Sequence, residues 1–233
     1  MNQSILKTSA ILLAGGQGAR LGSEEPKQFL NLGDKRVVEY SLELFDQSPD
    51  IHEIILVCPQ DFRESILLEN YHTQVVFADP GLRRQDSVYS GFLASSKDSE
   101  LLCIHDAARP FLAPTELSSV IQAGSEYGAA VLGTAAKNTI KKEDGHGFVE
   151  ATLDRSMLWE IQTPQVIKKS LLEKAFSYCY EHHIEVTDDA SLVESIGHQV
   201  KIVPGSYRNY KITTPDDWDT AQRVIHEEVR LTY

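Results

Sequence analysis

Three glycines stand close together directly after the first apolar run of the chain. They are Gly15, Gly16 and Gly18, and the cations Arg20 and Lys27 follow them. Glycines let a backbone approach a ligand closely and point successive N–H groups at an anion. Two cations beyond such a turn can fold over the same anion. The segment therefore predicts a phosphate cradle; the alternative is a glycine turn with two solvated cations.

The spacing of this segment differs from two common phosphate-binding motifs. Leu21 stands where a dinucleotide fingerprint has its third glycine, which argues against a dehydrogenase of the Rossmann type. The Gly-Lys-Ser/Thr ending of a P-loop is also missing from the segment. The sequence thus supports neither NAD binding nor a Walker-type ATPase.

Two further loops place charged residues after apolar runs. Gly81, Arg84 and Ser87 open a predicted helix, which presents backbone donors and a cation together. An ordinary turn with a helix cap is the alternative there. Asp106 ends another apolar run, and its carboxylate suits a magnesium ion that is held mostly by water and phosphates. His105 beside it is expected to be a hydrogen-bonded histidine at a strand end rather than a ligand.

Lys211 and Arg155 are the remaining candidate cations. Lys211 lies in a short extended run, where an ammonium group that points inward needs an anionic partner. Arg155 follows a predicted hairpin, and it is either a cation supplied across a dimer contact or a surface arginine. The acidic pairs at 188–189 and 216–217 are interpreted as N-terminal helix caps.

The elements that must position these residues follow a regular alternation. Short β-branched runs alternate with segments whose apolar residues lie three and four apart, which predicts a mostly parallel sheet covered by helices. The expected strands are Ser9–Leu13, Glu53–Cys58, Gln74–Ala78, Leu101–His105, Ala129–Ala136 and His198–Val203. The expected helices are Val37–Asp46, Phe62–Glu69, Gln85–Ser95, Thr115–Tyr127, Lys168–Tyr180, Ala190–Ile196 and Pro215–Val229. The predicted class is a Rossmann-like α/β fold with helices on both faces.

One segment breaks the alternation and predicts a projecting arm. Residues 139–142 and 148–153 flank Glu143-Asp144-Gly145 and have the pattern of a β-hairpin. The hairpin has few residues to bury inside its own domain, and packing on a second copy of the chain would solve that problem. We therefore expect a single domain over residues 1–233, a dimerisation arm at about 137–156, and a homodimer.

Composition narrows the classes of partner and compartment. With 22 Lys and Arg against 34 Asp and Glu, the net charge is −12, and an acidic surface repels nucleic acid. Cys58, Cys103 and Cys179 lack metal-ligand spacing and lie among apolar or aromatic neighbours, which favours the reduced cytoplasm. The chain has no apolar stretch near the ~20 residues that a membrane span needs, so a soluble protein without a membrane partner is expected.

Taken together, these motifs resemble the 2-C-methyl-D-erythritol 4-phosphate cytidylyltransferase family from about Ile11 to about Ala221. The family's opening Ala-Ala-Gly-x-Gly-x-Arg resembles residues 14–20, although Gly15 replaces the second alanine. The further matches are Pro26-Lys27-Gln28, the Gly-x-x-Arg-x-x-Ser loop at 81–87, His-Asp-Ala-Ala-Arg-Pro at 105–110, Thr-Asp-Asp-Ala-Ser at 187–191 and Asn-x-Lys-Ile-Thr-x-Pro-x-Asp at 209–217. Arg208 departs from an acid that some members carry near that position.

The resemblance implies transfer of CMP from CTP to a polyol phosphate with Mg²⁺, in non-mevalonate isoprenoid biosynthesis, by a homodimer with exchanged arms. The implied catalytic residues are Arg20 and Lys27, which stabilise the pentavalent transition state, and Arg155 and Lys211, which position the polyol phosphate. The implied CTP-binding residues are Ala14, Gly15, Gly16, Gly18, Gly81, Arg84, Ser87, Asp106 and Ala107. The implied polyol-phosphate residues are Thr139, Arg155, Thr163, Thr187 and Lys211, and Asp106 would lie near the metal.

Two other functions remain open at this point. The sister ribitol-5-phosphate cytidylyltransferases share the CTP half of the site, and Arg208 concerns the polyol half in which the two families differ. The unchanged 105–110 element and the 187–191 element favour methylerythritol phosphate. A regulatory module that binds a nucleotide without catalysis is the second alternative, and the presence of both Arg20 and Lys27 argues against it.

Overall fold

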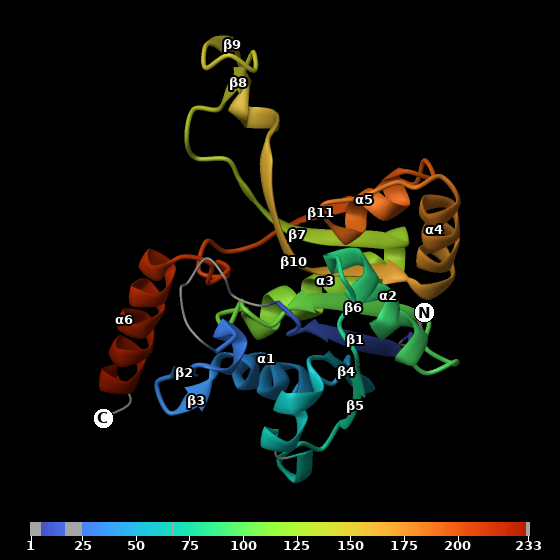
Figure 1. Ribbon diagram of the computed structural model, residues 1–233, viewed down its shortest axis with the longest axis vertical. Coiled ribbons are helices and arrows are strands. Elements are labelled where there is room, and N and C mark those ends of the chain that lie inside the picture. The colour runs from blue at the N-terminus through green and yellow to red at the C-terminus, as the bar shows by residue number, and fades with distance from the viewer. Residues whose placement is uncertain (1–5, 17–24, 67, 232–233) are drawn as a thin grey trace.

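A seven-stranded sheet forms the centre of the molecule (Figure 1). The computed structural model describes residues 6–16, 25–66 and 68–231, the last four of these by backbone alone. The strands lie in the order β11 (Lys201–Pro204), β7 (Ala129–Ala135), β10 (Trp159–Lys168), β6 (Leu101–Asp106), β1 (Thr8–Leu13), β4 (Glu53–Val57) and β5 (Gln74–Ala78). Neighbours are parallel except that β10 runs antiparallel to both β6 and β7. The predicted mostly parallel α/β fold is confirmed.

Helices cover both faces of the sheet, which explains why its central strands are continuous apolar runs. Along β1, Leu12 packs into one core with α1 (Val37–Asp46) and α3 (Pro114–Tyr127). Its neighbour Ile11 packs into the opposite core with α2 (Arg84–Ala94), α4 (Lys169–Glu181) and α5 (Asp189–Glu194). Every residue of β1, β4 and β6 is buried as a result. The three cysteines are free and buried.

Two segments differ from the sequence-based expectations. Residues 62–69, expected as an α-helix, form the separate 3₁₀ turns η2 (Gln60–Ser65) and η3 (Leu68–Asn70). Short i to i+3 bonds, such as Ile66 N–H to the Arg63 carbonyl, close these turns instead of an α-helical ladder. The ten-residue strand β10 was not expected, because Pro164 interrupts it and its register shifts between Ile161 and Gln165.

A long arm leaves the body of the molecule (Figure 1). It carries β8 (Lys141–Glu143), β9 (Val149–Thr152) and the 3₁₀ turn η4 (Arg155–Met157), between the end of β7 and the start of β10. The predicted projecting hairpin is confirmed. Phe148 and Met157 are 72% and 79% exposed on it, so the chain itself does not cover the arm's apolar side chains.

The last helix fixes the run that precedes it. Ala221 and Ile225 of α6 (Pro215–Leu231) share a small core with Ile212 and with Leu32 of the short β2 (Asn31–Leu32), which pairs with β3 (Lys35–Arg36). Ile212 also donates its N–H to the Ala108 carbonyl beyond β6. These contacts hold the neighbouring residue 211 beside the carboxyl end of β6. Among the described helices, none is long and apolar enough to cross a membrane.

Candidate active site

A cavity of about 480 Å³ opens at the carboxyl ends of β1, β5 and β6. This edge of a parallel sheet is where ligands bind in α/β proteins. The lining residues are Leu13, Gly15, Gly16, Gln28, Gly81, Leu82, Arg83, Arg84, Ser87, Asp106, Ala108 and Lys211. Among these described residues the cations outnumber the acid by three to one, so the cavity suits an anionic ligand.

Two glycines allow close contacts in the loops that wall this cavity. A Cβ on Gly81 would lie 2.4 Å from the Asp86 Cβ, and the Gly81 N–H donates to Ser87 Oγ at 3.0 Å. A Cβ on Gly15 would lie 2.4 Å from the Cβ of Pro80. The glycine turn after β1 and the loop after β5 therefore touch at Gly15, and a side chain there would force them apart. A side chain at Gly81 would instead push its loop away from the start of α2.

Charged side chains from separate segments pair beside the cavity. Lys211 Nζ donates to Asp106 Oδ2 at 2.7 Å, and Arg84 Nε donates to Asp106 Oδ1 at 3.2 Å. Arg84 also donates from Nη1 to Asp189 Oδ1 at 2.9 Å. Burial opposes ionisation of Asp106, but Arg84 and Lys211 outweigh it and hold the pKa of that carboxyl well below its usual range. Asp106 is thus the anionic partner that the sequence predicted for Lys211.

His105 has a structural role at the end of β6. Its side chain is fully buried, with Nδ1 3.1 Å from Thr163 Oγ1 and Nε2 3.3 Å from the Arg109 carbonyl oxygen. Burial lowers the pKa of His105 to about 4, so the ring is neutral at physiological pH. Thr163 Oγ1 also accepts the Asp106 N–H at 3.0 Å. Thr163 thus links the His105 ring to the Asp106 backbone, and His105 is a hydrogen-bonded histidine at a strand end, as expected.

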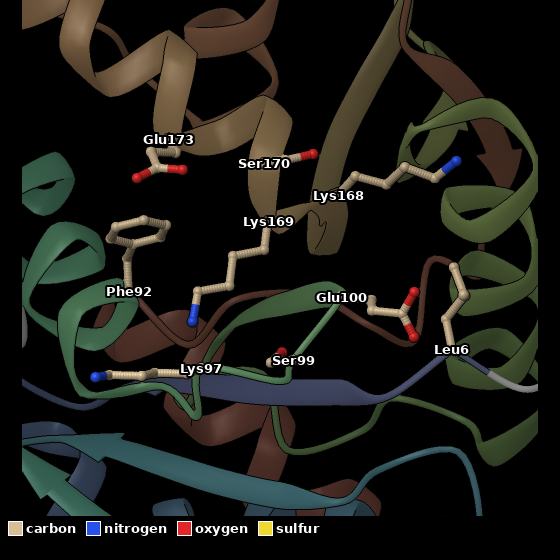
Figure 2. Close-up of a pocket in the computed structure, with 9 residues that line it drawn as sticks. All are labelled: Leu6, Phe92, Lys97, Ser99, Glu100, Lys168, Lys169, Ser170 and Glu173. Carbon is tan, nitrogen blue, oxygen red and sulfur yellow. The ribbon is translucent and has the colours of Figure 1, made fainter.

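A second cavity, of about 560 Å³, lies at the amino ends of β1 and β6 (Figure 2). Lys97, Lys168 and Lys169 line it, but the ammonium groups of Lys97 and Lys168 point to opposite sides of the view. Lys169 Nζ donates to the carbonyls of Ser95 and Ser96 at 3.2 and 2.6 Å. These lysines do not converge on one ligand, so the cavity at the carboxyl edge is the candidate active site.

Comparison with known proteins agrees with this geometry. The family model described as "IspD: 2-C-methyl-D-erythritol 4-phosphate cytidylyltransferase" matches residues 8–227. The chain belongs to this family. A chloroplastic 2-C-methyl-D-erythritol 4-phosphate cytidylyltransferase of Oryza sativa subsp. japonica is 45% identical over 222 residues, which are 94% of this chain and 75% of that protein. The enzyme of the same name from Geobacillus thermodenitrificans is 42% identical over 224 residues, 94% of this chain and 97% of that one.

Solved structures of the cytidylyltransferase family share the fold. The crystal structure of 4-diphosphocytidyl-2C-methyl-D-erythritol synthase from Anaerococcus prevotii superposes with a TM-score of 0.86 at 31% identity, covering 96% of this chain and all of that one. The 2-C-methyl-D-erythritol 4-phosphate cytidylyltransferase from Thermus thermophilus gives a TM-score of 0.79 at 29% identity, over 95% of this chain and 100% of that one. The resemblance stated from the motifs is confirmed at the level of the family.

The residues that the cytidylyltransferase motifs assign to CTP gather mainly at this cavity. Those that line it are Gly15, Gly16, Gly81, Arg84, Ser87 and Asp106. Ala14 and Ala107 are buried behind the wall, where their N–H groups donate to the carbonyls of Val57 and Leu13. Gly18 and Arg20 lie outside the described residues. The catalytic candidate Lys27 is buried on the 3₁₀ turn η1 (Lys27–Phe29), next to the lining residue Gln28.

The residues assigned to the polyol phosphate do not come together within one chain. Thr139 and Arg155 are exposed on the arm, where Arg155 donates to the Lys137 carbonyl. Thr187 is exposed before α5, and Thr163 is buried behind Asp106. Of these five residues, Lys211 lines the cavity.

One acidic residue has a different role from the one expected. Asp188 caps α5 by accepting the Ser191 N–H at 3.1 Å, as predicted, whereas Asp189 is fully buried against Arg84. At the start of α6 the cap is Thr214, whose Oγ1 accepts the Asp217 N–H at 3.3 Å, while Asp217 in the first turn accepts the N–H groups of Thr213 and Thr214 in return. The interpretation of Asp189 as a cap is wrong, because its side chain turns into the body of the protein. In the sequence, the one sign that Asp188 and Asp189 have different roles was that two acids stand side by side.

Proposed function

We propose that this chain transfers CMP from CTP to 2-C-methyl-D-erythritol 4-phosphate, in non-mevalonate isoprenoid biosynthesis. The products are 4-diphosphocytidyl-2-C-methyl-D-erythritol and pyrophosphate. The observation that carries the proposal is the cation-rich cavity at the carboxyl edge of the sheet, in a chain of this family. Glycine backbone, Ser87, Arg84 and Lys211 meet there around space for a polyphosphate.

The reaction needs charge compensation rather than a base. A phosphate monoester has its second pKa at about 6, so its oxygen is largely ionised at neutral pH. That oxygen attacks the α-phosphorus of CTP; a new P–O bond forms while the bond to the leaving pyrophosphate breaks and its electron pair leaves with it. No proton has to be removed from the nucleophile. A buried, neutral His105 with both ring nitrogens near protein partners fits a reaction without a general base.

Cations and fixed N–H donors supply most of the proposed rate enhancement. They offset the repulsion between a phosphate dianion and a triphosphate, and they act strongest where their positions are preorganised. In the proposed mechanism Arg20 and Lys27 stabilise the pentavalent transition state, while Lys211 and Arg155 position the polyol phosphate. Lys211 is already held in place by its ion pair with Asp106.

The donor set fits a magnesium ion that arrives with the triphosphate. Asp106 is the acidic side chain on the described cavity wall, and the described residues contain no cluster of three metal-ligating side chains. One carboxylate suits Mg²⁺ that keeps waters and phosphate oxygens as its other ligands. When bound, the ion would neutralise part of the triphosphate charge, and Asp106 is the residue proposed to hold it.

We propose a homodimer in which each arm completes the partner's site. Support comes from Thr139 and Arg155, which lie on the arm away from their own cavity, and from the exposed Phe148 and Met157. Burying such side chains against a second copy would stabilise the dimer. The proposed organisation is one domain over 1–233 with this dimerisation arm at about 137–156. CTP and the polyol phosphate are the proposed partners, with no nucleic acid.

The proposed compartment is the cytoplasm. Three free, buried cysteines support a reducing environment, where thiols stay unpaired. The rice relative is named chloroplastic.

The test is pyrophosphate release with CTP and Mg²⁺, with methylerythritol 4-phosphate and ribitol 5-phosphate as parallel acceptors. We expect release with the first acceptor alone. Release with ribitol 5-phosphate alone would assign the alternative substrate, for which Arg208 is the residue to examine. Thermal stabilisation by CTP without release from either acceptor would leave a nucleotide-binding module with another role.

A further inference from the structure

Four charged side chains form a continuous row of ion pairs that runs along the cavity wall and ends on a residue behind it. The row runs from Asp189 at the start of α5 to Arg84 at the start of α2, then to Asp106 at the end of β6 and to Lys211 before α6. Its links measure 2.9, 3.2 and 2.7 Å in that order. We propose that Asp189 is a positioning residue for Lys211, acting through Arg84 and Asp106 without touching substrate.

The charge balance of the row explains the effect. Two cations face two carboxylates, so Arg84 is shared between Asp189 and Asp106, and one oxygen of Asp106 is left for Lys211. Without the Asp189 charge, both cations would compete for the single carboxylate of Asp106. The Lys211 side chain is 35% exposed, so its ammonium is the one that moves toward water. The Asp189 charge therefore keeps the Lys211 ammonium beside Asp106 between catalytic cycles.

The neighbouring charges do not substitute for Asp189. Arg109 is a further cation near Asp106 and helps to lower the pKa of that carboxyl, but its guanidinium donates to the Asn209 carbonyl at 2.7 Å and it is no anion that could pair with Arg84. Asp188 accepts from Ser191 at the α5 cap and from Gln165 Nε2 at 3.0 Å. Asp188 is thus held by other partners, and the ion pair with Arg84 falls to Asp189.

The burial of Asp189 argues against a purely structural role. Its side chain is fully buried, and among the described residues its second oxygen, Oδ2, has no hydrogen-bond partner. A buried carboxylate with an unpartnered oxygen carries a desolvation cost that a neutral residue would avoid. Asp189 does not line the cavity, so substrate does not offset that cost directly. The compensating interaction is with Arg84, and through it with the site.

The inference rests on the proposed function, and its kinetic test uses Asp189→Asn with Asp188→Asn as the matched control. Both variants remove one negative charge at adjacent positions at the start of α5, but Asp188 pairs with Ser191 and Gln165 rather than with Arg84. We expect Asp189→Asn to lower kcat/KM for the polyol phosphate about tenfold while KM for CTP stays within about twofold. The control should keep both constants. Equal constants for Asp189→Asn and the wild-type chain would overturn the proposal.

A double-mutant cycle tests the route through Arg84. In an Arg84→Gln background, Asp189→Asn should cause no further loss of kcat/KM, because the link is already broken. It should raise the melting temperature of that background, since it removes a buried carboxylate that has lost its cation. If the two substitutions lowered kcat/KM by independent factors that multiply in the double variant, Asp189 would act by another route. That result would overturn the proposal.

A measurement without substrate separates this inference from the proposed function. Acylation of Lys211 by an amine-reactive ester, followed by mass spectrometry, should be several-fold faster in Asp189→Asn than in the wild-type chain or in Asp188→Asn, with Lys7 as the internal reference. Asp189→Glu keeps the negative charge, so Lys211 should be labelled nearly as slowly in this variant as in the wild-type chain. This second variant tests the inference if Asp189→Asn fails to fold. Unchanged labelling would overturn the inference even if pyrophosphate is released; absent pyrophosphate release with faster labelling would overturn the proposed function alone.

Discussion

The wall of the cavity and the projecting arm differ in how their charged side chains are paired: the paired carboxylate is buried on the wall and exposed on the arm. On the wall, Asp106 is buried and is paired with Arg84 and Lys211, which come from distant parts of the chain. On the arm, Lys142 and Glu150 pair across the hairpin while both are exposed, and such surface pairs contribute little stability. One chain supplies the partners for the charged side chains of the wall. The apolar and cationic side chains of the arm stay exposed on that chain. Under the proposed function, a working site needs both regions, from two copies.

The wall should show the largest effect when one of its cations is removed. Lys211→Ala is expected to lower kcat by about 10²–10³, by analogy with the loss of one preorganised donor. Lys27→Ala is expected to behave in the same way. Arg84 remains to pair with Asp106, so the Lys211 variant should fold normally. Steady-state pyrophosphate release measures the effect.

The matched control for these lysines is Lys35→Ala. The Lys35 side chain is 36% exposed and pairs with Glu43 away from the cavity, so its loss should leave kcat unchanged. Circular dichroism and melting temperature confirm that each variant is folded. Undiminished turnover in a folded Lys27 or Lys211 variant would remove that residue from the mechanism.

Mixing two inactive chains should test whether wall and arm act across the dimer. Arg155→Ala damages the arm and Lys211→Ala damages the wall, so a mixed dimer keeps one site with both residues intact. After unfolding and refolding together at equal amounts, about a quarter of wild-type activity should return, because half of the random dimers are mixed and each has one intact site. Separately refolded chains are the control. If the mixture stays as inactive as its components, the arm does not serve the partner's site.

The apolar surface of the arm should govern association more than folding. Phe148→Asp is expected to weaken the dimer at least about tenfold, because it removes a large apolar side chain from the proposed interface. Sedimentation at several concentrations measures this. Leu93→Asp is the control, since Leu93 is 65% exposed on α2 in the body of the molecule. Equal dissociation constants for both variants would contradict an interface at the arm.

The sequence predicted most of the fold because buried parallel strands leave a strong signal. Within Glu53–Val57, residues 54–57 are all apolar, and the helix at Val37–Asp46 was predicted with its observed bounds. The strand Trp159–Lys168 gave no such signal, since a proline lies inside it. Its antiparallel direction depends on the chain's return from the arm, which local patterns do not encode.

The candidate site was predicted in part, for a related reason. Gly81 and Asp106 stand beside recognisable strand ends, and the need of Lys211 for an anion followed from its apolar neighbours. The ion pair between Arg84 and Asp189 joins residues 105 positions apart, so no spacing rule could identify it. Gln28 faces the cavity through the packing of its 3₁₀ turn, which is also a tertiary effect.

The smallest expected effect concerns the close contact inside the wall. Gly15→Ala places a Cβ 2.4 Å from the Pro80 Cβ, and a proline ring cannot rotate away, so the two loops must separate. Overpacking of this kind costs about 1–3 kcal/mol, and we expect KM for CTP to rise several-fold while kcat changes little. Pro80→Gly in the same chain removes the ring and should restore KM, whereas Pro80→Gly alone loses only loop rigidity. A double variant as impaired as Gly15→Ala would mean that the loops are spaced by another contact. A restored KM for CTP would show that contacts within one chain set the spacing of the wall's loops, unlike the proposed packing of the arm on a second chain.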